Sequence, residues 1–424
     1  MRARACTWWR AATFFSGFAV ITVVAFADGG YFRETWVWTT LALSSLVGIV
    51  LLLRDKIVLG RLELAGLAAL ASFVGWVGLS AAWSQAPGDS VQEGERGLMY
   101  VAAVLAFVLL VDRDRIREYL AGIAAAATLV AAYSLGGRLL GDQPITSDPI
   151  QGTRLIEPLG YANALGILAA LGLLVSLGLA ARARSRRGRA LWLSPAMVLL
   201  PTFVSTESRG ASFALAAGLC VLVLVERARI AALLPGSRTM RKAIGAALAV
   251  LVVSVVAVAV LRADRPLGPR VDYWSVAWTQ WEENAWLGAG AGSFAQYWQR
   301  EDAPVAVRDA HSLYLETLAE LGPAGLMLLL GALASPIVAA LNARSHPLSG
   351  IGASAYTAYL VHAGLDWDWE MPAVTLAGLL CGVALLAACR QRRDEITIGP
   401  RGRRAFAVAA LAIAGLAVAG RLAD

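Results

Sequence analysis

Long runs of apolar residues, separated by short polar segments, constrain the fold of this chain most strongly. A helix that crosses a membrane needs about 20 mostly apolar residues. Only 16% of the 424 residues are charged and 58% are apolar, whereas soluble domains carry about 25% charged residues. We therefore predict an all-α fold, a polytopic membrane bundle of about 12–13 transmembrane helices. The thirteen predicted spans lie near residues 11–27, 35–53, 62–83, 97–111, 119–140, 160–181, 190–205, 210–225, 243–261, 323–341, 349–365, 371–389 and 405–420.

The basic residues predict how the chain is oriented. If the N-terminus is cytoplasmic and the spans alternate, the inner segments hold 26 of the 37 basic residues but only 8 of the 30 acidic ones. Basic residues are retained on the cytoplasmic side during insertion, so this orientation is the expected one. The net charge of +7 is then a signal of topology, and no nucleic-acid partner is predicted from it.

One connection between predicted spans is much longer than the others, and it is predicted to lie on the extracytoplasmic side of the membrane. Loops longer than about 12–15 residues are usually functional or disordered, and this one, residues 262–310, is too rich in aromatic residues to resemble a disordered segment. Such aromatics suit a membrane interface, sugar rings or both. The predicted units are therefore a transmembrane bundle over 1–261, an extracytoplasmic loop with short helices over 262–322, and transmembrane helices over 323–424.

Three features subdivide the loop. Arg270, Trp274, Ala277, Trp278 and Trp281 recur at helical spacing, which predicts a helix over 270–283 with these residues on one face. Residues 287–294 alternate glycine with other residues, a pattern that lets backbone N–H groups approach a ligand. A second helix is predicted over 310–321, with Asp309 as its cap and Gly322-Pro323 as its end.

Other polar residues lie at the predicted outer ends of the spans. Arg209 either faces a cavity or partner or pairs with Glu207, and Arg154 either binds a ligand or pairs with Glu157. Residues 366–370, Asp-Trp-Asp-Trp-Glu, are suited either to anchoring at the interface or to contacting sugars.

Four of these elements together resemble the O-antigen ligase family of bacterial envelope glycosyltransferases, which also contains polysaccharide polymerases. The resemblance rests on Arg154 with the motif Leu159-Gly160-Tyr161-Ala162-Asn163, on Ser208-Arg209-Gly210-Ala211, on Arg270 with the glycine-rich turn, and on the helix that begins at His311. The family commonly has Asn after this histidine, whereas the present chain has Ser312.

The resemblance implies a GT-C-like helical bundle in the bacterial inner (cytoplasmic) membrane with its active site on the extracytoplasmic face. The implied donor is a glycan on undecaprenyl diphosphate, and the acceptor is a hydroxyl of a glycan, lipid or protein. The implied enzyme is a metal-independent, inverting glycosyltransferase that needs no cofactor. A polysaccharide polymerase of the same family uses the same chemistry and is the alternative; a glycan or lipid transporter or flippase is disfavoured because no inverted repeat is evident.

Catalytic roles follow from the chemistry of this reaction. Arginine stays charged and binds phosphate through planar, bidentate contacts, so Arg209 and Arg270 are the predicted diphosphate ligands. Histidine has an ordinary pKa of about 6.5 and can accept the proton of the acceptor hydroxyl, a role assigned to His311. The remaining predicted substrate-binding residues are Arg154, Asn163, Tyr273, Trp274 and Tyr314.

Overall fold

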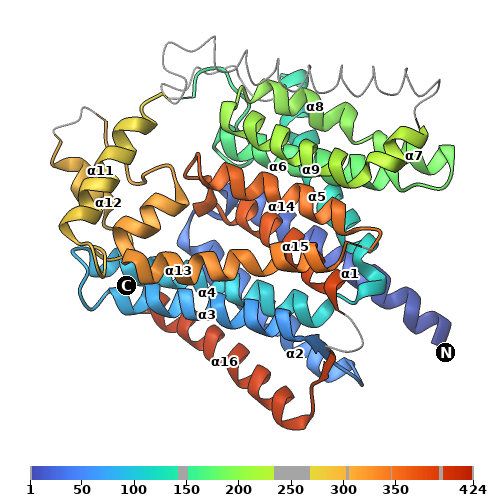
Figure 1. Ribbon diagram of the computed structural model, residues 1–424, viewed down its shortest axis with the longest axis horizontal. Helices are drawn as coiled ribbons and strands as arrows, with labels where there is room; N and C mark the ends of the chain where they lie inside the picture. The colour runs from blue at the N-terminus through green and yellow to red at the C-terminus, as the bar shows by residue number, and fades with distance from the viewer. Residues whose placement is uncertain are drawn as a thin grey trace.

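The computed structural model describes residues 2–141, 151–233, 268–301, 305–344, 346–390 and 395–422. Most of the described chain is helical (Figure 1). The α-helices are α1 (Arg2–Ala25), α2 (Arg33–Leu53), α3 (Arg61–Ser80), α4 (Pro87–Leu110), α5 (Ile116–Leu140), α6 (Ala162–Ala181), α7 (Arg186–Leu193), α8 (Ala196–Ser205), α9 (Arg209–Leu233), α11 (Arg270–Glu283), α12 (Phe294–Gln299), α13 (Leu313–Asn342), α14 (Ser349–Ala363), α15 (Pro372–Cys389) and α16 (Pro400–Leu422). Short 3-10 turns cover Asp28–Gly30, Arg113–Arg115 and Asp368–Glu370, and the strands are β1 (Val58–Gly60) and β2 (Glu395–Thr397).

Within the described ranges, nine helices are long and apolar enough to cross a membrane. They coincide with nine of the thirteen predicted spans, which confirms an all-α polytopic membrane bundle. Of the other four, 97–111 overlaps the second half of the longer helix α4, 349–365 overlaps the 15-residue helix α14, and 190–205 is divided between α7 and α8. The predicted span 243–261 lies outside the described residues.

The helices pack around a buried centre formed by α6, α14 and α15. Helix α14 contacts α6, α9 and α15, α13 packs against α3 and α15, and α16 lies across α2 and α4. Figure 1 shows α11 and α12 gathered at one end of the bundle and the start of α1 at the other. We refer to these as the α11 end and the opposite end.

Ion pairs and a two-stranded ribbon hold the opposite end together. Arg390 donates to both carboxylate oxygens of Glu63, at 2.6 and 3.1 Å, and Arg54 makes a bidentate pair with Asp112. Strands β1 and β2 pair antiparallel, with Leu59 opposite Ile396. The Arg390–Glu63 pair and the β1–β2 ribbon join residues that are more than three hundred positions apart in the sequence, so both halves of the chain belong to one bundle.

The predicted interruption between the second loop helix and the next span is confirmed at Gly322. This glycine has φ 66° and ψ −174° within α13, a conformation that L-residues with a side chain avoid. Helix α13 therefore consists of a site segment, residues 313–321, and a longer membrane segment. The predicted cap is wrong, because α13 begins after Ser312 without a side-chain cap and Asp309 lies further upstream.

The predicted helix over 270–283 matches α11. The side chains buried against the rest of the protein are Val276, Ala277 and Gln280, whereas Trp278 is exposed. The small cluster beneath them includes Phe294 and Tyr297 of α12. The spacing predicted that Arg270 and the tryptophans share a face, but it could not show which side of the helix meets α12 and α13.

Helix α5 offers a direct test of the bundle's close packing. A Cβ on Gly122 would lie 2.3 Å from the carbonyl oxygen of Phe14 in α1, whereas a Cβ on Gly136 of the same helix meets nothing within 4 Å. Small residues let membrane helices approach closely. We expect Gly122→Ala to lower the midpoint of thermal unfolding in detergent by several degrees, and Gly136→Ala to leave it unchanged. Equal midpoints for the two variants would contradict this packing.

Candidate functional site

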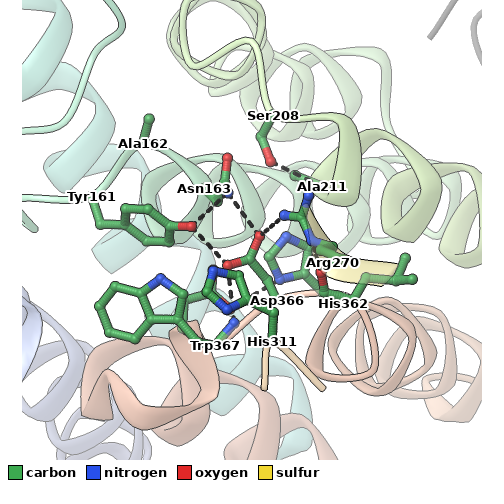
Figure 2. A network of polar contacts seen from close by, with 12 residues as sticks. Tyr161, Ala162, Asn163, Ser208, Ala211, Arg270, His311, His362, Asp366 and Trp367 are labelled. Carbon is green, nitrogen blue, oxygen red and sulfur yellow. Dashed lines mark hydrogen bonds and ion pairs between the residues drawn. The ribbon is translucent and has the colours of Figure 1, made fainter. Parts of the chain in front are cut away.

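A buried carboxylate, Asp366, organises the polar residues at the α11 end. It lies between α14 and α15 and is fully buried. Its oxygens accept hydrogen bonds from Arg270 at 2.6 Å, from the Tyr161 hydroxyl at 2.8 Å and from the Asn163 amide at 2.7 Å (Figure 2). Three separate parts of the chain, around α6, α11 and the α14–α15 connection, therefore meet at this one side chain.

Arg270 is fixed along one edge of its guanidinium group. Its Nε donates to the carbonyl of Leu365 at 2.5 Å and its Nη2 to Asp366. Nη1 has no partner among the described residues, and the side chain is 16% exposed. The edge with Nε and Nη2 is thus held in place, while Nη1 on the other edge can bind an anion.

The charge of Asp366 follows from these contacts. Burial alone would favour the neutral acid, but the guanidinium of Arg270 and the neighbouring histidines more than offset it, so the pKa of Asp366 is lowered from its ordinary value. Asp366 is therefore ionised at neutral pH and forms a true ion pair with Arg270.

His311 lies beside this ion pair with its imidazole oriented. Its ring is 4.8 Å from the ring of Tyr273, one turn along α11 from Arg270. Its Nδ1 is 3.0 Å from the carbonyl oxygen of Asp309. A carbonyl can only accept, so Nδ1 carries the proton in the neutral ring, and Nε2 retains a lone pair. Figure 2 shows the imidazole next to Asp366.

Two further properties mark His311 as a specialised residue. Its φ of 55° lies in the left-handed region, where a residue with a side chain is uncommon and strained. Burial lowers its pKa, although the charge of Asp366 opposes the shift. The imidazole is therefore mainly neutral at pH 7 and can act as a base.

A carboxylate of α13 holds the backbone just before the histidine, and others lie close to it. Glu316 accepts the N–H of Ala310 at 2.7 Å. One oxygen each of Asp309, Glu316 and Glu370 lie within 4.8 Å of one another, and burial with the nearby Glu370 raises the pKa of Asp309 well above its ordinary value. Carboxylate oxygens are ligands for divalent ions, so this acidic group is where the described residues could hold one. Arg96 already donates to Glu370 at 2.8 Å and supplies positive charge.

The glycine-rich turn does not form the ligand cradle expected from its sequence. The N–H groups of Gly292 and Phe294 both donate to the carboxylate of Glu320, each at 2.9 Å, and that of Gly290 donates to the carbonyl of the same residue. The turn is therefore bound to α13. A Cβ on Gly288 would lie 2.2 Å from backbone atoms of Glu320, so glycine is needed here for packing.

Arg209 begins α9, whose first turn is capped by the Ser208 hydroxyl accepting from the N–H of Ala211 at 3.1 Å. Its Nη2 is 3.8 Å from the position that a Cβ on Gly268 would occupy, two residues before Arg270. The structure thus places Arg209 near the start of α11, close to the second predicted diphosphate ligand.

Of the two alternatives for Arg154, the ion pair with Glu157 does not form among the described residues. Instead, Arg154 donates to Asn163 at 3.3 Å and to Gln151. Because Asn163 also donates to Asp366, Arg154 is linked to the central carboxylate through one intervening side chain.

Tyr314 and Trp274 are less directly placed for substrate. The Tyr314 hydroxyl donates to the carbonyl of Leu360 at 2.8 Å, which joins α13 to α14. The Trp274 side chain is half-buried, and its Nε1 has no hydrogen-bond partner among the described residues. Their binding of substrate stays a prediction.

Sequence reasoning missed the main role of residues 366–370. Interfacial anchoring and sugar contact were both considered, yet Asp366 and Asp368 are buried and Glu370 pairs with Arg96. Oδ1 of Asp368 lies 3.0 Å from Nδ1 of His362. The regular alternation of acidic residues was the available signal, but the partners of each lie far away in the sequence.

Comparison with known protein families shows a similarity over part of the chain. A family model described as O-antigen ligase matches residues 195–330, from α8 to the middle of α13. The matched segment contains Arg209, Arg270 and His311, whereas Asp366 and its partners on α6 lie outside it. A search of curated proteins finds no match. Residues 195–330 are thus similar to the O-antigen ligase family, within a chain whose described residues include nine helices long and apolar enough to cross a membrane.

Proposed function

We propose that this protein transfers a glycan from undecaprenyl diphosphate to an acceptor hydroxyl on the extracytoplasmic face of the bacterial inner membrane. In this proposal, Arg270 and Arg209 bind the diphosphate and His311 is the general base. The closeness of an oriented, neutral imidazole to an arginine with one open edge is the observation that carries it.

The proposed step is a single displacement at the anomeric carbon. The acceptor oxygen attacks this carbon while its proton passes to Nε2 of His311. The bond from the anomeric carbon to the phosphate oxygen breaks, and its electron pair leaves with undecaprenyl diphosphate. Attack opposite the leaving group inverts the anomeric configuration. Negative charge develops on the diphosphate, where a preorganised guanidinium stabilises it most effectively.

The contacts of Arg270 support this assignment. Asp366 and Leu365 prevent the guanidinium from rotating, so little reorganisation is needed when the leaving group becomes charged. Tyr273 lies on α11, as Arg270 does, and packs on the imidazole of His311. This contact keeps His311 close to Arg270. Arg154 and Asn163 extend the polar surface toward α6.

The orientation of the chain supports an extracytoplasmic reaction. The helices α11 and α12 lie at the end of the bundle opposite to the start of α1 (Figure 1), and the positive-inside rule assigns the basic N-terminus to the cytoplasm. A site outside the cytoplasm has no access to nucleotide sugars there, which fits a donor that is carried on a lipid.

Reconstitution tests the proposed function directly. The purified full-length protein is supplied with an undecaprenyl-diphosphate oligosaccharide and, separately, with lipid, protein and glycan acceptors, and the products are analysed. Transfer to a lipid or protein identifies a ligase, whereas extension of the donor glycan identifies a polymerase. Absence of transfer to every acceptor, with intact folded protein, would overturn the proposal.

Removal of the arginine charge should abolish most turnover. We expect Arg270→Gln to lower kcat/KM for the donor by about a thousandfold, the loss typical of a group that stabilises developing charge, and Arg270→Lys to retain more activity because it keeps the charge. Arg300→Gln is the control, since Arg300 pairs with Glu283 at the exposed surface. Wild-type activity in Arg270→Gln would remove this residue from the mechanism.

Replacement of the imidazole tests the base. His311→Asn suits the left-handed backbone, which Asn tolerates, and we expect it to lower kcat by about a hundredfold or more. In the wild type, kcat/KM should stay constant from pH 8 to pH 7 and fall only below the ordinary histidine pKa of about 6.5, because the pKa of His311 is lowered and its protonated form is inactive. If the residual activity of His311→Asn shows the same fall at low pH, that fall belongs to another titrating group.

The proposed independence from metal is tested by chelation. We expect turnover to be unchanged after dialysis against EDTA, because Arg209 and Arg270 supply the positive charge. Loss of activity with EDTA and recovery with Mg²⁺ would contradict this expectation and would direct attention to Asp309, Glu316 and Glu370.

A further inference from the structure

A second buried pair, His362 with Asp368, lies next to the Arg270–Asp366 ion pair. His362 is on the last turn of α14 and is 1% exposed, as is Asp368. Their contact, Nδ1 to Oδ1 at 3.0 Å, spans the connection between α14 and α15. Figure 2 shows His362 close to Arg270 and Asp366. The proposed reaction makes no use of either member of the pair.

The pair closes a tight loop that presents both anchors of Arg270. The carbonyl of His362 accepts the N–H groups of Leu365 at 2.8 Å and Asp366 at 3.0 Å. Leu365 and Asp366 are the two residues that bind the guanidinium of Arg270. The side chain of His362 then fixes Asp368, two residues further on. Backbone and side chain of one histidine thus hold both ends of the segment that positions Arg270.

The outer edge of the imidazole packs against α9. Nε2 of His362 has no hydrogen-bond partner among the residues that the structure describes, and it lies 3.2 Å from where a Cβ on Gly210 would be. No group of substrate size fits between them, so Nε2 is not a substrate contact. This arrangement presses the loop against the first turn of α9, which begins with Arg209.

We infer that His362 and Asp368 are positioning residues for the transfer reaction and that they act through Arg270. They set the loop that holds Asp366 and Leu365, and these hold the guanidinium in register with the leaving group. This inference rests on the proposed function, because it assigns the pair to the diphosphate end of the reaction. A displacement of about 1 Å at such a group can cost about a hundredfold in rate.

A double-mutant cycle tests the inference with the full-length protein in detergent. We expect His362→Leu to lower kcat/KM for the donor about 10- to 100-fold, with the KM for the acceptor unchanged. His362→Asn should recover most of the loss, because its amide nitrogen can donate from nearly the position of Nδ1. In an Arg270→Lys background, His362→Leu should change kcat/KM less than about threefold, because residues that act through one group are not additive.

Controls separate positioning from folding. His346 is another buried imidazole, at the opposite end of the bundle, and we expect His346→Leu to leave kcat/KM unchanged. Thermal unfolding of each variant is recorded. Fully additive effects of His362→Leu and Arg270→Lys, or a loss of activity in His362→Leu that His362→Asn does not recover, would overturn the inference.

A binding measurement separates failure of this inference from failure of the proposed function. Radiolabelled undecaprenyl diphosphate, the product lipid, is titrated against the wild type and His362→Leu. We expect about tenfold weaker binding in the variant, equivalent to one factor of ten in the equilibrium constant. Equal binding by both proteins would overturn the role of the pair alone, whereas wild-type protein that neither binds this lipid nor transfers glycan would overturn the function itself.

Discussion

The ion pair between Arg270 and Asp366 is the contact on which the arrangement of the site depends. Burying a carboxylate without a partner is costly, and Asp366 is fully buried because Arg270, Tyr161 and Asn163 all donate to it. The same contact that stabilises the acid also holds the arginine in one orientation. Charge compensation and preorganisation are therefore achieved by a single interaction, and loss of either partner would affect both.

The motif that begins at His311 and continues into α13 has a structural role as well as a chemical one. Glu316 holds the backbone before the histidine, and Glu320 holds the glycine-rich turn. Helical spacing of four residues places both carboxylates on one face, where they bind two different loops. Glu316 and Glu320 of the motif therefore hold the neighbouring loops in place, and His311, its first residue, is the one to which we assign a catalytic role.

The bundle could be predicted from the sequence, because apolar runs and helix length are local properties. Nine spans, the helix over 270–283 and the interruption at Gly322 were predicted correctly. Partners distant in the sequence could not be: nothing in the residues around Arg270 indicates Asp366, which lies almost one hundred positions later. The same limit explains why the glycine-rich turn was predicted to face a ligand when it binds Glu320.

The left-handed conformation of Gly322 divides α13, so the site segment is not a rigid continuation of the membrane-spanning helix. Because the hydrogen-bond ladder does not continue through that residue, the segment with His311 is oriented by side-chain contacts rather than by the axis of the span below it. Heat or detergent that loosens those contacts can therefore disorganise the reacting groups while the lipid-embedded scaffold persists. Inactivation at a lower temperature than global unfolding is the behaviour that such an architecture produces.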